Sequence, residues 1–172
     1  MRPSTPLPIR LRLLVPVLLA ATLQAACNPT YNWREHANGD GAYKVLFPAK
    51  PATFTRPVDL DGLRVQMTMT AAEVKGVTFA VGSAVAPDAA RAQAALPAMR
   101  LALVRNIGAD ENAIHDEARV DALGVGANRQ PVRLQGRFEA RGARLYQVIV
   151  LGPPDAAPPE QVDQFLSSFT PL

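Results

Sequence analysis

The chain has 172 residues, which is enough for one domain of ordinary size and too few for two typical domains. Its formal net charge of +3 comes from Arg2, Arg10 and Arg12, because residues 27–172 carry 15 basic and 15 acidic side chains. This balance removes the usual argument for phosphate binding, and we expect no nucleic-acid partner.

Residues 1–26 are predicted to form a cleavable leader. Three arginines and no acid come first, and residues 13–23 then form the apolar run LLVPVLLAATL. As a helix this run covers roughly 16 Å, about half the thickness of the hydrocarbon layer, and Pro16 interrupts it. The pattern therefore favours a secretory signal over a permanent membrane span.

The stretch Gln24-Ala25-Ala26-Cys27 resembles the cleavage box of bacterial lipoproteins, although that family prefers leucine where Gln24 stands. The resemblance implies that signal peptidase II cuts before Cys27, whose thiol carries diacylglycerol and whose amino group is acylated. Two or more acyl chains make membrane attachment stable. The expected location is the cell envelope, facing the periplasm, and Asn28 in place of aspartate weakly favours the outer membrane.

Cleavage by the ordinary signal peptidase is the alternative. It would release a soluble periplasmic domain that binds a small ligand in a groove between helix and sheet. Cys27 is the single cysteine of the chain, so no disulfide can form within one molecule. An exported free thiol would be exposed to oxidation. Lipidation removes that liability, and the sequence therefore favours the lipoprotein.

Residues 27–41 are predicted to be a tether that includes a short first strand in YNWREH, and residues 42–172 are predicted to form a single domain. In AYKVLF, the apolar Tyr43, Val45 and Phe47 alternate with other residues, as in a strand.

Pro57 confines the next segment to the edge of a sheet. Residues 64–71 (RVQMTMTA) alternate strictly between apolar and polar side chains, which indicates a half-buried antiparallel strand. Asp61-Gly62 and Gly76 mark the turns on either side of it. Together with AYKVLF and VTFAVGSAV, these segments predict a meander of four strands.

Residues 87–108 change to a helical period. Asp88 is the expected cap at the start and Gly108 the expected end, while Pro97 conflicts with the helix interior. We expect one helix, bent at Pro97. Its packing stripe comprises Ala92, Leu96, Met99, Leu103 and Ile107.

Three further strands are predicted near residues 115–122, 130–140 and 144–151, followed by a helix near 159–169. The segment LYQVIVLG is apolar on both faces apart from Gln147, so it is expected at the centre of the sheet. The packing face of the last helix comprises Val162, Phe165, Leu166 and Phe169.

This order of elements predicts an α+β fold: a twisted antiparallel sheet covered by a long central helix and a carboxyl-terminal helix. The segments AYKVLFPAKP and EQVDQFLSSF resemble the two ends of PsbP-like domains, in which helices cover a twisted sheet. The resemblance spans residues 42–169. It implies a fold with many non-enzymatic members and no shared catalytic set, so no functional residue is carried over.

Catalytic and metal-binding patterns are weak. His36 and His115 are the two histidines, and with Cys27 committed they are too few for a metal site. Ser83 in VGSAV lacks the second glycine of a nucleophile elbow, and the glycines of LGVGANRQP fit a turn better than a phosphate loop. We expect no catalytic residue, no metal and no cofactor.

Arg133, Arg137 and Arg141 share one face if residues 131–141 are extended. Such a face would attract an anionic polymer or an acidic envelope protein. The alternative is a solvated face that neighbouring strands neutralise. The sequence thus predicts a non-enzymatic envelope lipoprotein that acts as a binding or assembly factor.

Overall fold

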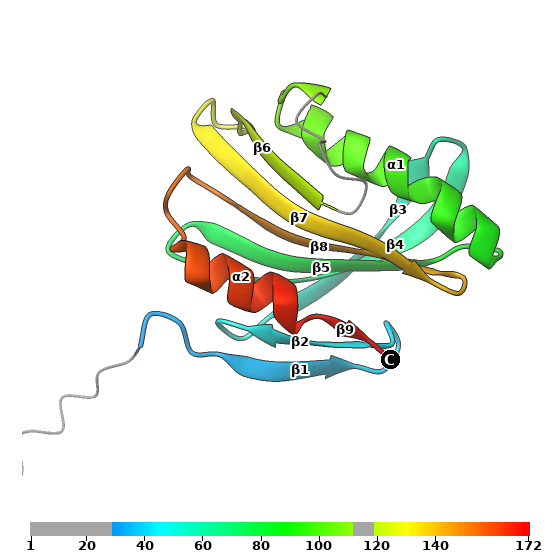
Figure 1. Cartoon of the computed structure of the whole chain (residues 1–172), viewed down its shortest axis with the longest axis horizontal. Helices are drawn as coiled ribbons and strands as arrows, with labels where there is room; N and C mark the ends of the chain where they lie inside the picture. The colour runs from blue at the N-terminus through cyan, green and yellow to red at the C-terminus, as the bar shows by residue number, and fades with distance from the viewer. Residues whose placement is uncertain (1–28, 112–118) are drawn as a thin grey trace, which may run out of the picture.

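The computed structural model describes residues 29–111 and 119–172 (Figure 1). The strands in these residues are β1 (Arg34–Asn38), β2 (Tyr43–Phe47), β3 (Ala52–Leu60), β4 (Leu63–Val74), β5 (Val77–Val85), β6 (Arg119–Val125), β7 (Pro131–Arg141), β8 (Arg144–Gly152) and β9 (Thr170–Pro171). The helices are α1 (Ala89–Asn106) and α2 (Pro159–Ser168).

The strands form two antiparallel sheets. The large sheet has the order β3-β4-β5-β8-β7-β6, and the small sheet has the order β1-β2-β9. Helix α1 covers one face of the large sheet, while α2 and the small sheet lie on the other (Figure 1). The mixed fold with antiparallel strands and two covering helices agrees in outline with the sequence prediction.

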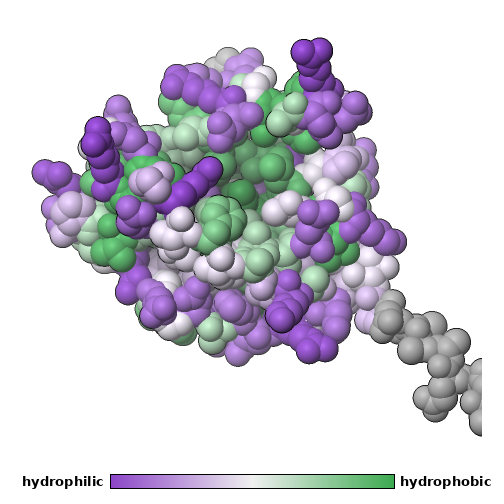
Figure 2. All heavy atoms as spheres, turned by 180° about the vertical axis from the view of Figure 1, so that it is seen from behind, coloured by the Kyte–Doolittle hydropathy of each residue, from purple (hydrophilic) through white to green (hydrophobic). Residues whose placement is uncertain are grey.

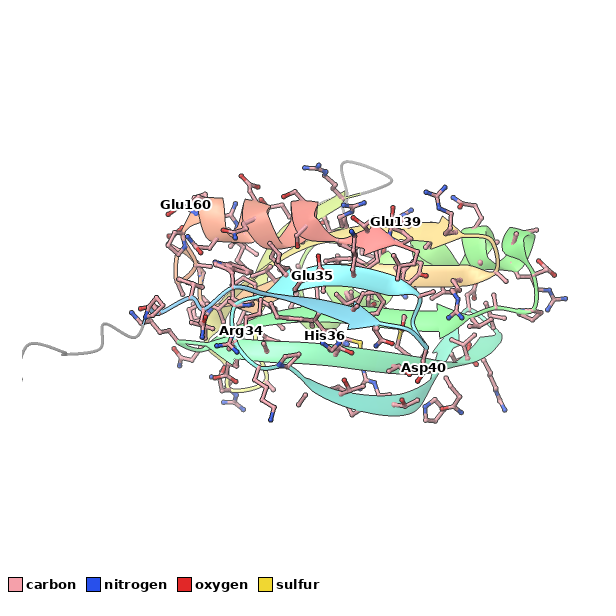
Figure 3. All side chains as sticks on the ribbon, turned by 90° about the horizontal axis from the view of Figure 1, so that it is seen from below. Arg34, Glu35, His36, Asp40, Glu139 and Glu160 are labelled. Carbon is pink, nitrogen blue, oxygen red and sulfur yellow. The ribbon has the colours of Figure 1, made fainter. Side chains whose placement is uncertain are left out.

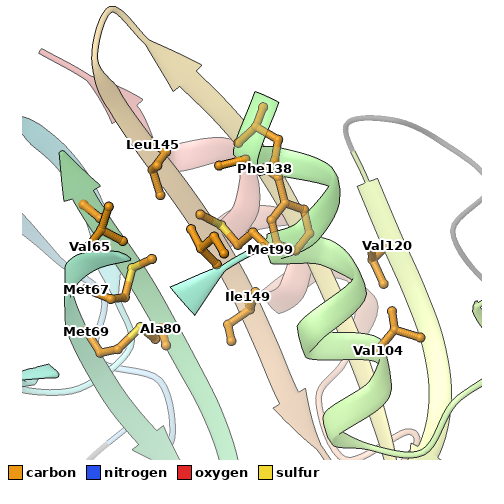
Figure 4. Close-up of a cluster of buried hydrophobic side chains, with 14 of the residues drawn as sticks. Val65, Met67, Met69, Ala80, Met99, Val104, Val120, Phe138, Leu145 and Ile149 are labelled. Carbon is orange, nitrogen blue, oxygen red and sulfur yellow. The ribbon is translucent and has the colours of Figure 1, made fainter. Parts of the chain in front are cut away.

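Each face of the large sheet has its own hydrophobic core. In β4, Val65, Met67 and Met69 face α1, and Figure 4 shows them in the same cluster as Met99 of the helix. Ala72 and Val74, on the even-numbered positions further along β4, belong to the core beneath the small sheet. This is the period-two pattern that the sequence predicts.

Strand β8 lies inside the large sheet, between β5 and β7. Leu145 and Ile149 belong to the α1 core, and Tyr146 and Val148 belong to the opposite one. The prediction of a central strand covered on both sides is confirmed.

The turn between β3 and β4 explains the position of Pro57. Asp61 and Gly62 have φ angles of 56° and 85°, as expected for a two-residue hairpin turn of type I′. In such a hairpin Leu60 and Leu63 form a hydrogen-bonded pair, and every second pair along the strands repeats it. Pro57 falls on the intervening positions, so the N–H that it lacks would point away from β4. The prediction of an edge strand is confirmed.

Helix α1 is a single helix that contains Pro97. An Asp88 carboxylate oxygen accepts a hydrogen bond from the Arg91 N–H at 2.7 Å, which caps the start. Gly108 has φ 59°, and the Ala109 N–H donates to the Val104 carbonyl at 3.1 Å, which closes the end. Both expected boundaries are confirmed.

The predicted meander of four strands is wrong in one respect. β3, β4 and β5 are consecutive neighbours, but β2 pairs with β1 and β9 in the small sheet. The reason is the aromatic face of β2: the Phe47 ring packs against Phe165 and the Tyr43 ring against Tyr146 and Phe169. These contacts require β2 to lie in a separate layer across from the large sheet.

The described residues include part of the segment that the sequence assigned to the tether. Tyr31 and Trp33 stack and both meet the Phe79 ring edge-on. The Trp33 indole N–H donates to the Gln161 Oε1 atom at 2.9 Å, and the strand itself begins at Arg34. In the described part of the chain, neither helix is long and apolar enough to cross a membrane.

Candidate functional site

Several residues singled out in the sequence lie outside the described ranges, including Cys27 and His115. Ser83 is buried in β5, as expected of a packing residue. His36 lies beside Arg34 and Glu35 along β1, and its ring meets Phe47 edge-on (Figure 3). Among residues 29–111 and 119–172, no three His, Cys, Asp or Glu side chains gather as a metal site would require.

Gly124 and Gly126 have structural roles. A Cβ atom on Gly124 would collide with the Ile107 carbonyl oxygen, so glycine permits the close approach of the α1 end to β6. The Gly126 N–H donates to the Gln130 carbonyl at 2.8 Å, which closes the turn between β6 and β7.

The three arginines of the predicted anionic-partner face do share one side of β7, opposite the residues that pack against α1. The Arg133 guanidinium donates to both carboxylate oxygens of Asp121, at 2.8 and 2.7 Å. These hydrogen bonds hold the pKa of the Asp121 carboxyl below its usual value. Arg141 is exposed at the end of the strand.

Arg137 is engaged with α2. Its guanidinium donates to the Leu166 carbonyl at 3.0 Å and to the Glu139 carboxylate at 3.1 Å, and it lies 5.7 Å from the centre of the Phe169 ring. A cation at the carboxyl end of a helix is favourable because the helix dipole is negative there. Arg133 and Arg137 thus stabilise the fold, and their charges are largely neutralised by partners within the protein.

A different feature has the character of a binding site: a groove between α1 and the β3–β4 hairpin, called the α1 groove below. Its volume is about 280 Å³, close to the lower end of ligand pockets. Strand β3 supplies residues 56–60 of its wall. The other lining residues are Met67 of β4, Gln147 of β8, and Met99, Ala102, Leu103 and Asn106 of α1.

Seven of the eleven residues that line the α1 groove are apolar, although the polar side chains contribute nearly as much of its open surface. Figure 2 shows the molecule from behind, the side on which β3 and β4 lie, and an apolar hollow is visible in its upper half. Met67, Met99 and Leu60 are buried, whereas Leu103 and Val58 are partly exposed towards the groove. Methionine side chains are flexible and polarisable, so they adapt to ligands of different shape.

Gln147 is the polar residue of the floor, with 7% of its surface exposed. Its amide nitrogen donates to the Met69 sulfur at 3.3 Å. A thioether is a weak acceptor, and within the described residues the Gln147 amide has no other hydrogen bond. The remaining hydrogen-bonding capacity of this amide faces the groove and is available to a ligand.

The neighbours of Gln147 are arranged to admit its side chain. Phe54, Met69, Gly82 and Gln147 lie in register across β3, β4, β5 and β8. A Cβ atom on Gly82 would lie 2.6 Å from the Gln147 Cγ and 2.7 Å from the Met69 sulfur. The absence of a side chain at Gly82 therefore leaves the space that the buried amide occupies.

Arg56 brings a positive charge to the wall of the α1 groove. Its side chain is exposed and, within the described residues, has no hydrogen bond or ion pair. Asp59, the acid of the same wall, is already engaged: its carboxylate accepts from the Gly62 N–H at 2.6 Å and lies 3.6 Å from Arg64. The charge available to a ligand is therefore positive.

A second groove lies between the β1–β2 turn and strands β3, β4 and β5, with a volume of about 530 Å³. Its hydroxyl groups mostly satisfy one another. Thr53 and Thr70 are 3.2 Å apart, and Thr55 and Thr68 are 2.8 Å apart. Because these hydroxyl groups are already paired, the second groove offers fewer free hydrogen-bonding groups to a ligand than its size suggests. We therefore take the α1 groove as the better candidate.

Sequence reasoning noted Gln147 as the polar exception in an apolar strand but gave it no role. Arg56 and Gly82 were missed altogether. Their significance depends on the register of β3, β4, β5 and β8, which brings together residues far apart in the chain. The lone glutamine in LYQVIVLG was the one usable signal.

A scan against protein-family models and searches of curated proteins and of solved structures found no match.

Proposed function

We propose that this protein is a non-enzymatic, lipid-anchored binding protein of the bacterial cell envelope, which holds a small apolar ligand in the α1 groove. The observation that carries the binding role is the amide of Gln147 on the floor of that groove, whose one hydrogen bond within the described residues goes to the weakly accepting Met69 sulfur. A few polar groups in a mostly apolar lining orient ligands, so an amide with spare hydrogen-bonding capacity at this place favours recognition of a ligand.

The chemistry of the groove favours binding over catalysis. Its charged side chains are Arg56 and Asp59, and the Asp59 carboxylate is held by the Gly62 N–H and Arg64. An amide and a guanidinium are good groups for orienting a ligand but do not form a nucleophile and base pair. The groove therefore supports a carrier, sensor or assembly role.

The envelope location rests on the leader and on Cys27, as the sequence indicates. Growth of the source cells, or of a bacterial host, with an alkyne-tagged fatty acid should label the wild-type protein. The Cys27→Ala variant should carry no label, and Ala25→Gly, a small-residue change in the same box, should keep it. Label that persists in Cys27→Ala would refute the anchor.

Ligand binding is tested separately on the purified mature chain with the neutral fluorescent probe N-phenyl-1-naphthylamine. Ala102 is exposed on α1 and lines the groove, so Ala102→Trp should fill it and weaken probe binding about tenfold or more. Ala94 is exposed on the same helix but does not line the groove, and Ala94→Trp is the matched control. Equal binding by the two variants would refute the groove as the site.

The alternative is a soluble periplasmic protein that binds a ligand in the same groove. The position of the α1 groove between helix and sheet suits this alternative equally well. Fractionation separates the two: the lipid-anchored protein should leave the membrane pellet only with detergent, whereas the soluble protein should appear in the periplasmic extract.

A further inference from the structure

We infer that the ligand of the α1 groove is an elongated apolar molecule with a carboxylate at one end, which pairs with Arg56. This inference rests on the proposed binding role of the groove and names the class of molecule that the groove selects. Three features carry it: the charge of the wall, the shape of the cavity and the chemistry of the floor.

The charge of the wall selects an anion. The Arg56 guanidinium lines the groove without a partner in the described part of the chain, whereas the Asp59 carboxylate is engaged by the Gly62 N–H and Arg64. A guanidinium offers a planar pair of donors that matches a carboxylate, and such charge-assisted hydrogen bonds are about twice as strong as neutral ones. A cationic ligand would meet repulsion at the same place.

The shape selects an elongated body. Arg56 stands on β3 and Gln147 on β8, and these strands are three spacings apart in the sheet order, about 14 Å at the usual strand separation. A volume of about 280 Å³ extended over that distance is narrow. It suits a chain better than a fused ring system.

The floor selects an apolar body with limited branching. Met67 and Met99 line the groove, and Leu103 forms part of its helix wall. These side chains offer apolar contact to a ligand that reaches from Arg56 towards Gln147. Each methylene buried there contributes roughly 0.8 kcal/mol, so the apolar chain supplies most of the affinity and the carboxylate supplies the selectivity.

Displacement of N-phenyl-1-naphthylamine by three ten-carbon compounds with different ends tests the inference. Decanoate should compete about tenfold better than decanol with the wild-type protein, because its carboxylate is ionised at pH 7 and pairs with Arg56. Decylamine should compete less well than decanol. The preference for decanoate should decline as salt is added, because the charge pair at the exposed Arg56 is screened.

Two variants assign the selectivity to one residue. In Arg56→Gln, decanoate and decanol should compete within about twofold of each other. Arg91→Gln removes the same charge from the exposed start of α1, away from the groove, and should keep the tenfold preference. Circular dichroism and thermal melting would show that both variants are folded.

The outcomes separate this inference from the function on which it rests. If decanol and decanoate compete equally with the wild type, or if Arg56→Gln keeps the preference, the carboxylate inference is wrong while the groove stands as a binding site. If no compound displaces the probe and Ala102→Trp binds it as the wild type does, the proposed binding role and the inference fall together.

Discussion

Gly82 lies directly opposite Gln147 across the β5–β8 pair, and the space of its missing side chain is occupied by the glutamine amide. A polar residue in the middle of an apolar sheet face therefore depends on a specific neighbour that makes room for it. Both residues face the layer that α1 covers. The pair therefore places one polar side chain, Gln147, in this otherwise apolar layer at the floor of the α1 groove.

Replacement of Gln147 by leucine should leave the protein as stable as the wild type or up to about 1 kcal/mol more stable. Leucine has a similar size and removes an amide whose one hydrogen-bond partner within the described residues is the Met69 sulfur. Urea unfolding measures the change. The same variant should bind decanoate with altered affinity, and a loss of more than about 2 kcal/mol in stability would show that Gln147 is a structural residue.

Replacement of Gly124 by alanine should destabilise the fold by about 2–3 kcal/mol. The new methyl group would meet the Ile107 backbone carbonyl, which cannot move without disturbing the hydrogen bond from the Val125 N–H. Gly39→Ala is the control, because nothing lies within 4 Å of a Cβ atom there. Similar melting temperatures for the two variants would contradict the close packing of α1 against β6.

Replacement of Phe165 by alanine should cost about 3–5 kcal/mol in the free energy of unfolding. Its ring is fully buried between Phe47 of the small sheet and Phe79 of the large sheet. Phe54→Ala removes an equal side chain from an exposed position and should cost much less. Chemical denaturation distinguishes them, and comparable losses would argue against the aromatic layer as the main link between the sheets.

The ion pair of Asp121 with Arg133 predicts a specific dependence of stability on pH. Since the pKa of the Asp121 carboxyl is lowered in the folded state, mainly by the hydrogen bonds from Arg133, the pair stabilises the fold above the unfolded pKa of about 3.9. That contribution is lost as the pH falls through the folded pKa. Thermal melting should be measured between pH 6 and pH 2. The wild type should have a higher melting temperature than Asp121→Asn at pH 6, and the two melting temperatures should converge as the pH falls.

Arg133→Gln is the reciprocal variant for this test. It removes the partner whose hydrogen bonds lower the pKa of Asp121, so it should lose the same stability at pH 6. Like Asp121→Asn, it should also show a smaller fall in melting temperature between pH 6 and pH 2 than the wild type. If the difference in melting temperature between the wild type and Asp121→Asn stays constant down to pH 2, the ion pair does not cause the dependence of stability on pH in this range.

Local patterns predicted the elements well because their causes are local. The alternation around Met67 specifies a strand whatever its partners are, and Asp88 and Gly108 bound a helix through contacts within a few residues. Pro57 indicated an edge strand because a missing N–H cannot sit between two strands. In each case the physical reason operates within one segment of the chain.

Pairings between distant segments were not predictable in this way. The strand from Tyr43 to Phe47 looked like a neighbour of the next strand along the chain, but its partners include Thr170 and Pro171. Arg137 was placed on the correct face of its strand, yet the Leu166 carbonyl that binds it belongs to α2. The α1 groove depends on similar long-range register, since Arg56 and Gln147 come from opposite halves of the chain.

The small sheet joins segments from the two halves of the described chain. Tyr43 and Lys44 pair with the residues just after α2, and the Leu172 N–H donates to the Ala42 carbonyl at 2.8 Å. If the protein is threaded through an export channel with its amino terminus leading, β2 emerges long before its partner strand. The aromatic layer then closes only when the carboxyl-terminal segment has followed, so this layer completes its folding after nearly the whole chain has passed.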